Sequence, residues 1–257
     1  FRSTGSPVLN LQPSQAMSPA VESGRLALLR KLNDDHRRRH PRELELDARI
    51  SNLELAARMQ LAATDAVDIS QESKSTHQAY GLENPKTESY GRRCLMARRL
   101  VEAGVGFVTV TCTGWDMHGG GKEYTITDGM PVQAPAVDRA ASAFIEDIIQ
   151  RGLYEKVLLV ITGEFGRTPK INSKGGRDHW GNLCTLAFAG GGLKMGQIIG
   201  ASNKTVSEPA RDQVSSSQLL GTVMHTLLDI PNLRLRNNFP AEIQRVITNS
   251  QPIKQLI

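Results

Sequence analysis

The stretch KVLLVITGEFGR, residues 156–167, decides the fold, because a continuous apolar run stands between polar flanks and ends in a polar loop. An apolar run without alternation is typical of a strand buried on both faces of a parallel sheet. A second run of this type occupies residues 183–189 and ends at Gly190. These two segments predict the central strands of a sheet.

Helical patterns surround these strands. Upstream, residues 90–104 predict a basic amphipathic helix, residues 107–112 predict a strand by their alternation, and residues 132–151 predict a long helix. Downstream, residues 197–199 predict a short strand and residues 215–230 a helix capped by Ser215 or Ser216. The order of these elements predicts an α/β fold over residues 88–257, with a mostly parallel sheet and helices on both faces.

The N-terminal part is expected to be helical. Residues 1–16 are rich in Ser, Pro and Gly, which is typical of a linker. Apolar residues recur at helical spacing over residues 18–39, where Pro19 suits the first turn, and again over residues 46–61. We expect two helices in an antiparallel hairpin, inside a helical segment (residues 17–87) that packs on the core.

Composition narrows the functional classes. With 39% hydrophobic and 22% charged residues, the chain has the composition of a globular protein. The net charge of +5 owes much to residues 37–42, but no aromatic residue there offers base stacking. A solvated helix end is therefore favoured over a nucleic-acid-binding arm. No apolar run is long enough to predict a membrane span, and three widely spaced cysteines predict neither a disulfide framework nor a metal motif.

Polar residues follow the predicted strands directly, where ligands bind in open α/β sheets. Asp116 and His118 come after the strand predicted at residues 107–112. Being two residues apart, they point to one side of an extended segment. A carboxylate oxygen and an imidazole nitrogen suit Zn²⁺, Mn²⁺ or Fe. The alternative interpretation is a polar turn in which Asp116 binds backbone amides.

Two further loops carry polar residues of the same kind. Glu164 follows the first apolar strand and is predicted to be a metal ligand or general base, while Arg167 can hold two oxygens of a phosphate or sulfate group. An ion pair between Glu164 and Arg167 that only orders the loop is the alternative. Asp178 and His179 precede the second strand. Asp178 is predicted either to orient His179 or to reach a metal together with it.

A resemblance to a known family is carried by GWDMHGGG (114–121), VLLVITGEFGRTPKIN (157–172), GGRDHWGN (175–182) and DQVSSSQLLGTVMHTLLDI (212–230). From about residue 17 onward the sequence resembles the bacterial family catalogued as domain of unknown function 1501. That family is similar to the alkaline phosphatase and sulfatase superfamily. The resemblance implies the C-terminal part of an alkaline phosphatase-like domain, in an exported protein of the periplasm or cell envelope.

The resemblance also has implications for the site. In the superfamily, Asp and His at strand ends hold two divalent metals, and a Ser, Thr or formylglycine nucleophile attacks phosphorus or sulfur. Asp116 and His118 match one metal-ligand loop, and His179 matches the later histidine position. Glu164 and Phe165 stand where an Asp-His pair is usual, which removes one imidazole ligand. The nucleophile is expected upstream of residue 1, or it is absent.

The leading hypothesis is a metal-dependent hydrolase of phosphate or sulfate esters, whether small molecules or polysaccharides. The competing hypothesis is a non-catalytic domain that binds an anionic or carbohydrate partner and keeps a degraded metal site. Under the first hypothesis a divalent metal (Zn, Mn, Fe or Ca) is bound by Asp116, His118, Glu164 and His179, and the catalytic residues are Asp178, in support of a ligand, and Arg167, on the anion.

Overall fold

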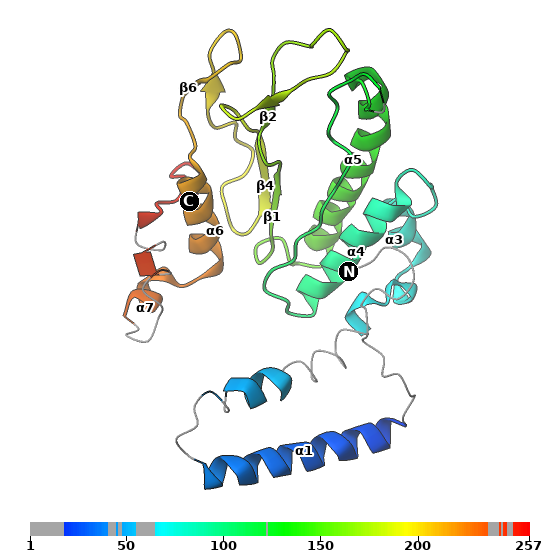
Figure 1. Ribbon diagram of the computed structural model, residues 1–257, viewed down its shortest axis with the longest axis vertical. Helices are drawn as coiled ribbons and strands as arrows, with labels where there is room; N and C mark the ends of the chain where they lie inside the picture. The colour runs from blue at the N-terminus through cyan, green and yellow to red at the C-terminus, as the bar shows by residue number, and fades with distance from the viewer. Residues whose placement is uncertain are drawn as a thin grey trace. The chain divides into compact units, whose positions relative to one another are not determined.

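The computed structural model describes residues 18–40, 45, 48–54, 65–121, 123–235, 242, 244–245 and 249–257 (Figure 1). The chain divides into two compact units. One consists of Phe1–Gln78 and Arg92–Val110, and the other of Ala79–Gly91 and Thr111–Ile257. The linker predicted over residues 1–16 lies outside the described residues. All residues proposed for the site belong to the second unit.

The first unit is helical. It contains α1 (Pro19–Arg39), η1 (Ile69–Gln71) and most of α3 (Lys74–Ala79) and α4 (Glu88–Glu102). The prediction for α1 is confirmed: the Ser18 side chain accepts a hydrogen bond from the Val21 amide, and Pro19 occupies the first turn. Residues 48–54 are helical. Residues 55–61 lie outside the described residues, so the antiparallel hairpin stays a prediction.

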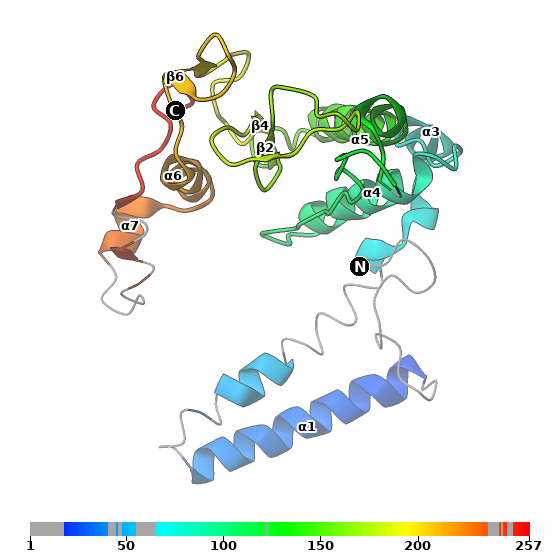
Figure 2. The same ribbon diagram turned by 45° about the horizontal axis from the view of Figure 1, so that its top comes forward.

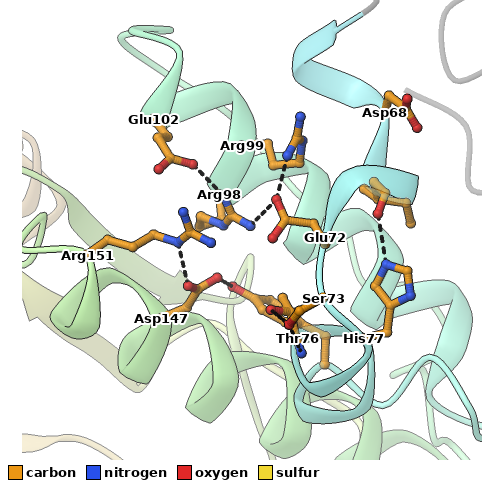
Figure 3. A network of polar contacts seen from close by, with 12 residues as sticks. Asp68, Glu72, Ser73, Thr76, His77, Arg98, Arg99, Glu102, Asp147 and Arg151 are labelled. Atoms are coloured by element: carbon orange, nitrogen blue, oxygen red, sulfur yellow. Dashed lines mark hydrogen bonds and ion pairs between the residues drawn. The ribbon is translucent and has the colours of Figure 1, made fainter.

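A buried ionic group joins the segment after η1 to α4. The side chain of Arg98 is fully buried, and only 6% of the Glu72 side chain is exposed. Glu72 Oε1 lies 2.6 Å from Arg98 Nη2 and 2.5 Å from Arg99 Nη1, and Arg98 also pairs with Glu102 (Figure 3). Because buried cations need nearby negative charge, Glu72 is an important electrostatic partner in this unit.

The described part of the second unit includes three named helices and three pairs of strands. The helices are α5 (Ile126–Gln150), α6 (Ser216–Leu227) and α7 (Ile230–Arg234). The strands are β1 (Leu158–Thr162) with β4 (Leu186–Gly190), β2 (Gly166–Arg167) with β3 (His179–Trp180), and β5 (Ala201–Ser202) with β6 (Pro209–Arg211). Each pair is antiparallel. The β1–β4 pair lies between α5 and α6 (Figures 1 and 2).

The strands differ from the sequence prediction in direction and burial. Leu158 lies opposite Gly190 and Thr162 opposite Leu186, so β1 and β4 are antiparallel instead of parallel. Residues of β1 are half-buried or exposed, not buried on both faces. A parallel pair requires a crossover, usually helical, whereas the segment between β1 and β4 contains only the short strands β2 and β3. A mostly parallel sheet of the alkaline phosphatase type stays a prediction.

Two predicted strands are not formed. The structure assigns no strand to residues 107–112 or 197–199. Residues 107, 109 and 111 are nevertheless exposed, while residues 108, 110 and 112 are half-buried. The alternation predicted the two sides of an extended segment, but a strand also needs a hydrogen-bonded neighbour. A local pattern does not supply that neighbour.

Helix α5 begins six residues before the predicted start. Thr125 caps the helix by accepting a hydrogen bond from the Asp128 amide, and two prolines are accommodated inside it. Ala140, Phe144 and Ile148 lie on its buried face. This long helix is the support for the loop that precedes it.

Helix α6 confirms the predicted cap. The Ser215 side chain accepts a hydrogen bond from the Gln218 amide, and the Gln218 side chain accepts one from the Ser215 amide, which is a capping box.

Among the residues that the structure describes, no helix has both the length and the apolar character needed to cross a membrane.

Candidate metal centre

Asp116 and His118 project to the same side of the loop before α5. Met117 between them is 3% exposed and is buried against the helix. A Cβ atom on Gly129 of α5 would lie 2.7 Å from Met117 Sδ, so the glycine leaves room for the sulfur. In an extended segment the neighbours of an inward-facing residue face outward. The buried Met117 therefore anchors the loop and directs Asp116 and His118 away from α5.

The β2–β3 pair supplies the second half of the site. Arg167 lies opposite His179, and Gly166 lies opposite Trp180. Residues directly opposite each other in an antiparallel pair have side chains on the same face. A Cβ on Gly166 would lie 2.0 Å from the carbonyl oxygen of Leu183, so no larger residue fits there. The pairing brings Arg167 and His179 side by side.

Backbone contacts join these two halves. The Arg177 amide donates to the Met117 carbonyl at 2.9 Å. A Cβ on Gly176 would lie 2.0 Å from the carbonyl carbon of His118. This approach is possible only for glycine, because a side chain would collide with backbone. Segments that are about 60 residues apart in the sequence thus share one site, as the sequence hypothesis required.

Three potential ligand atoms meet at the centre of the site. His118 Nε2 lies 2.9 Å from Asp116 Oδ1 and 3.1 Å from His179 Nε2, and His179 Nε2 lies 3.3 Å from Asp116 Oδ1. For metal–nitrogen bonds of about 2.0–2.1 Å, adjacent ligands are separated by about 2.9 Å in an octahedron and about 3.4 Å in a tetrahedron. The observed separations fall in this range. The three atoms are spaced as ligands on one face of a metal ion.

Asp178 contacts the other nitrogen of His118. The distance from His118 Nδ1 to Asp178 Oδ1 is 3.0 Å. This hydrogen bond is the main reason why the pKa of His118 is raised, with a smaller contribution from Asp116. It likewise lowers the pKa of Asp178. A metal-binding imidazole usually donates its second N–H to a carboxylate, which is the arrangement seen here.

Arg167 and Phe165 complete the surroundings of the three atoms. Arg167 Nη1 donates to Asp116 Oδ1 at 2.8 Å, and this bond, followed by that of His179, lowers the pKa of Asp116. The Phe165 ring lies 4.3 Å from the imidazole of His179, measured between ring centroids. Arg167 Cζ lies 5.5 Å from the centroid of the same ring. Phe165 thus contacts both residues that the β2–β3 pair aligns.

The structure places five of the predicted site residues together. Asp178 was predicted to orient His179, but its carboxylate accepts a hydrogen bond from His118 instead. Glu164 is exposed after β1 and does not belong to the group of possible ligands among the described residues. At this bend it is Phe165 that contacts His179, so a ligand role for Glu164 stays a prediction. The residues brought together are Asp116, His118, Arg167, Asp178 and His179.

Sequence reasoning missed Asn172. Its side chain donates to both the His118 carbonyl and the Asp178 carboxylate. The sequence signal was weak, because an Asn before a Ser-Lys-Gly-Gly segment is typical of any turn. Its place in the site depends on the contact with His118, which lies 54 residues away in the chain.

The fold and the site define a protein with a candidate metal centre, built from two histidines and an aspartate beside short antiparallel strands. The family model described as "Protein of unknown function (DUF1501)" matches residues 1–257, so the chain belongs to this family. No curated protein and no solved structure matches the chain. Membership of the family is therefore shown, whereas similarity to the alkaline phosphatase and sulfatase superfamily stays a prediction.

Proposed function

We propose that Asp116, His118 and His179 bind a divalent metal ion, and that the protein uses it to hydrolyse phosphate or sulfate esters. The observation that carries the proposal is the spacing of the three ligand atoms, 2.9 to 3.3 Å. If His118 Nδ1 donates to Asp178 and Nε2 carries no proton, the lone pair of Nε2 faces a carboxylate oxygen, so either a second proton or a metal ion must lie there. The second proton belongs to the metal-free form, and the metal ion takes its place in the bound form.

The donor set limits the choice of metal. Two imidazole nitrogens and one carboxylate oxygen suit Zn²⁺, Mn²⁺ or Fe²⁺. Calcium prefers a shell made entirely of oxygen ligands, so the two histidines disfavour it. Three protein ligands also leave room for a further ligand, as in catalytic zinc sites. The donor set therefore supports a reactive centre more than a closed structural one.

The surrounding residues have distinct proposed roles. Asp178 holds the N–H at His118 Nδ1, so that Nε2 is the atom available for a metal. Arg167 uses Nη1 on Asp116, and its other guanidinium donors can bind the oxygens of a phosphate or sulfate group. A bound divalent metal would supply Lewis-acid polarisation of the ester. Export to the periplasm or cell envelope, which the family resemblance implies, is part of the proposal.

Elemental analysis of the purified protein tests the metal centre. We expect stoichiometric Zn, Mn or Fe in the wild type, and its loss in Asp116→Asn and His179→Gln. His40→Gln, at an exposed histidine at the end of α1, is the matched control and should retain the metal. Retention of the metal by both site variants would refute the proposed ligands.

Hydrolysis of aryl phosphates and aryl sulfates tests the reaction separately. Activity that follows the metal content across the variants supports the hydrolase. Metal binding without hydrolysis would support the proposed metal centre but refute the proposed reaction. A protein with neither metal nor activity would support the competing hypothesis of a domain that binds an anionic or carbohydrate partner.

A further inference from the structure

Asn172 lies at the junction of the two loops that form the site. On one side its Oδ1 accepts hydrogen bonds from the amides of Lys174 and Gly176, both at 3.0 Å. The backbone N–H of Asn172 donates to the Gly176 carbonyl at 2.9 Å. These bonds fix the turn that leads into Arg177 and Asp178. The turn brings Gly176 against the backbone of His118.

On the other side, Asn172 Nδ2 donates to two acceptors. One is the His118 carbonyl oxygen at 3.0 Å, and the other is Asp178 Oδ1 at 3.2 Å. Asp178 Oδ1 is also the atom that faces His118 Nδ1. The side-chain amide of Asn172 therefore contacts both residues of the His118–Asp178 hydrogen bond.

These contacts require an amide at this position. The oxygen side of Asn172 meets only donors, and the nitrogen side meets only acceptors. A carboxylate would satisfy the first set and repel the second, because it has no proton to donate. A serine would be too short to reach both sets. Asparagine has the size and the two functional groups that the junction demands.

We propose that Asn172 is a positioning residue, which holds Asp178 against His118 and thereby presents Nε2 of His118 to the metal. This inference rests on the proposed metal centre and adds a residue that does not itself contact the metal. Removing a residue that supports a metal ligand by hydrogen bonds typically weakens metal binding about 10- to 100-fold, and Asn172 contacts both the His118 backbone and its partner Asp178. The role predicts weaker metal binding without loss of the fold.

The test uses Asn172→Asp, which changes one amide group to a carboxylate at constant size. Asn84→Asp is the matched control, because Asn84 Oδ1 also accepts from the amide of the lysine two residues later, Lys86. Co²⁺ titration followed by visible absorption reports both affinity and coordination. We expect about 10- to 100-fold weaker binding for Asn172→Asp and unchanged binding for Asn84→Asp.

A double variant separates positioning from general loop stability. Asp178 Oδ1 accepts from both Asn172 Nδ2 and His118 Nδ1, so a residue that positions Asp178 acts on the metal through it. We expect Asn172→Asp to weaken Co²⁺ binding much less in an Asp178→Asn background than in the wild type. Equal affinity of Asn172→Asp and the wild type would overturn the inference, as would an equal loss of affinity in the two backgrounds. If Asn172→Asp does not fold, Asn172→Gln is tested in the same way, because it moves the amide by one methylene.

The inference can fail independently of the metal centre. ¹⁵N NMR of metal-free protein reports whether His118 Nδ1 carries a proton hydrogen-bonded to Asp178. If the wild type binds no metal, the proposed function fails, but the NMR comparison remains decisive. Loss of that hydrogen bond in Asn172→Asp supports the positioning role, and an unchanged His118 spectrum overturns it.

Discussion

Gly176→Ala tests whether the close approach of the two loops sets the metal geometry. The added Cβ would lie 2.0 Å from the carbonyl carbon of His118, 2.1 Å from its oxygen and 2.5 Å from the Gly119 amide nitrogen. An ordinary Cβ contact begins at 3.4 Å, so the loops must separate by about 1.4 Å. All the atoms in conflict belong to the backbone. A rotation of one side chain therefore gives no relief.

The consequence for metal binding follows from the ligand spacing. Nε2 of His118 would move relative to Nε2 of His179 by about half of the 3.1 Å that now separates these two atoms. Metal–ligand bonds of about 2.0–2.1 Å cannot follow a movement of that size at both residues. We expect metal affinity to fall by about 100-fold or more, beyond the loss of a supporting hydrogen bond alone. The cost in stability is expected to be about 1–3 kcal/mol, as for other overpacked sites.

Gly181→Ala provides the control, because a Cβ at this position meets nothing within 4 Å although Gly181 directly follows β3. Affinity is measured by competition with a chromophoric chelator, and folding by circular dichroism and thermal unfolding. The control should match the wild type in both. A folded Gly176→Ala protein that binds metal within twofold of the wild type would refute the reasoning, since the contact would then not determine the ligand geometry.

Three other predictions concern charge. Glu72→Gln should lower the free energy of unfolding by about 3 kcal/mol, the lower end of the range for a broken buried ion pair. Glu102→Gln, at a side chain that is 37% exposed, should lower it by only about 0–1 kcal/mol. Urea unfolding compares the two variants, and equal effects would contradict the prediction. Asp178→Asn should lower the pKa of His118 in metal-free protein, because the hydrogen bond to Asp178 is the main cause of its raised value; NMR titration of the imidazole measures this, and an unchanged pKa would show that Asp178 is not the cause. Metal affinity should fall as the pH drops below the raised pKa of His118, because a proton then occupies Nε2; an affinity that is constant through this range would exclude Nε2 as a ligand atom.

The pH dependence of stability in the metal-free protein has a definite sign. The raised pKa of His118 gives stabilisation that is present at low pH and is lost as the pH rises through this pKa. The lowered pKa of Asp178 gives stabilisation that is present at high pH and is lost as the pH falls through that pKa. The pair therefore stabilises the fold only in the window between the two values, with protonated His118 and ionised Asp178.

Local signals in the sequence predicted the starts of two helices. Pro19 in the first turn of α1 and the Ser215 cap of α6 were recognisable because these signals involve only residues within one turn. The start of α5 was missed because Pro131 lies just before the predicted start, whereas the helix already begins six residues earlier, at Ile126, with Thr125 as its cap. The direction of β1 relative to β4 was also missed. An apolar run indicates that a strand forms, but the partner and its direction depend on how the intervening chain returns.

The site was predictable to the extent that neighbouring residues determine it. The two-residue spacing of Asp116 and His118 was sufficient to predict a shared side, and the buried Met117 between them explains why. The partner of Asp178 was not predictable in the same way, because His118 lies 60 residues away. Asn172 was missed for the same reason. Of its four side-chain hydrogen bonds, the one to the His118 carbonyl joins residues that only the folded chain brings near.

The charges of the site connect its metal-free and metal-bound forms. His118 has a carboxylate at each ring nitrogen, Asp178 at Nδ1 and Asp116 at Nε2. With Arg167 on Asp116 and a proton on both nitrogens of His118, two negative charges are balanced by two positive ones. A divalent metal at Nε2 displaces one proton and leaves an excess of one positive charge, next to the free donors of Arg167. An anion then binds more favourably than a neutral molecule, so the metal that organises the site also selects the class of ligand that it accepts.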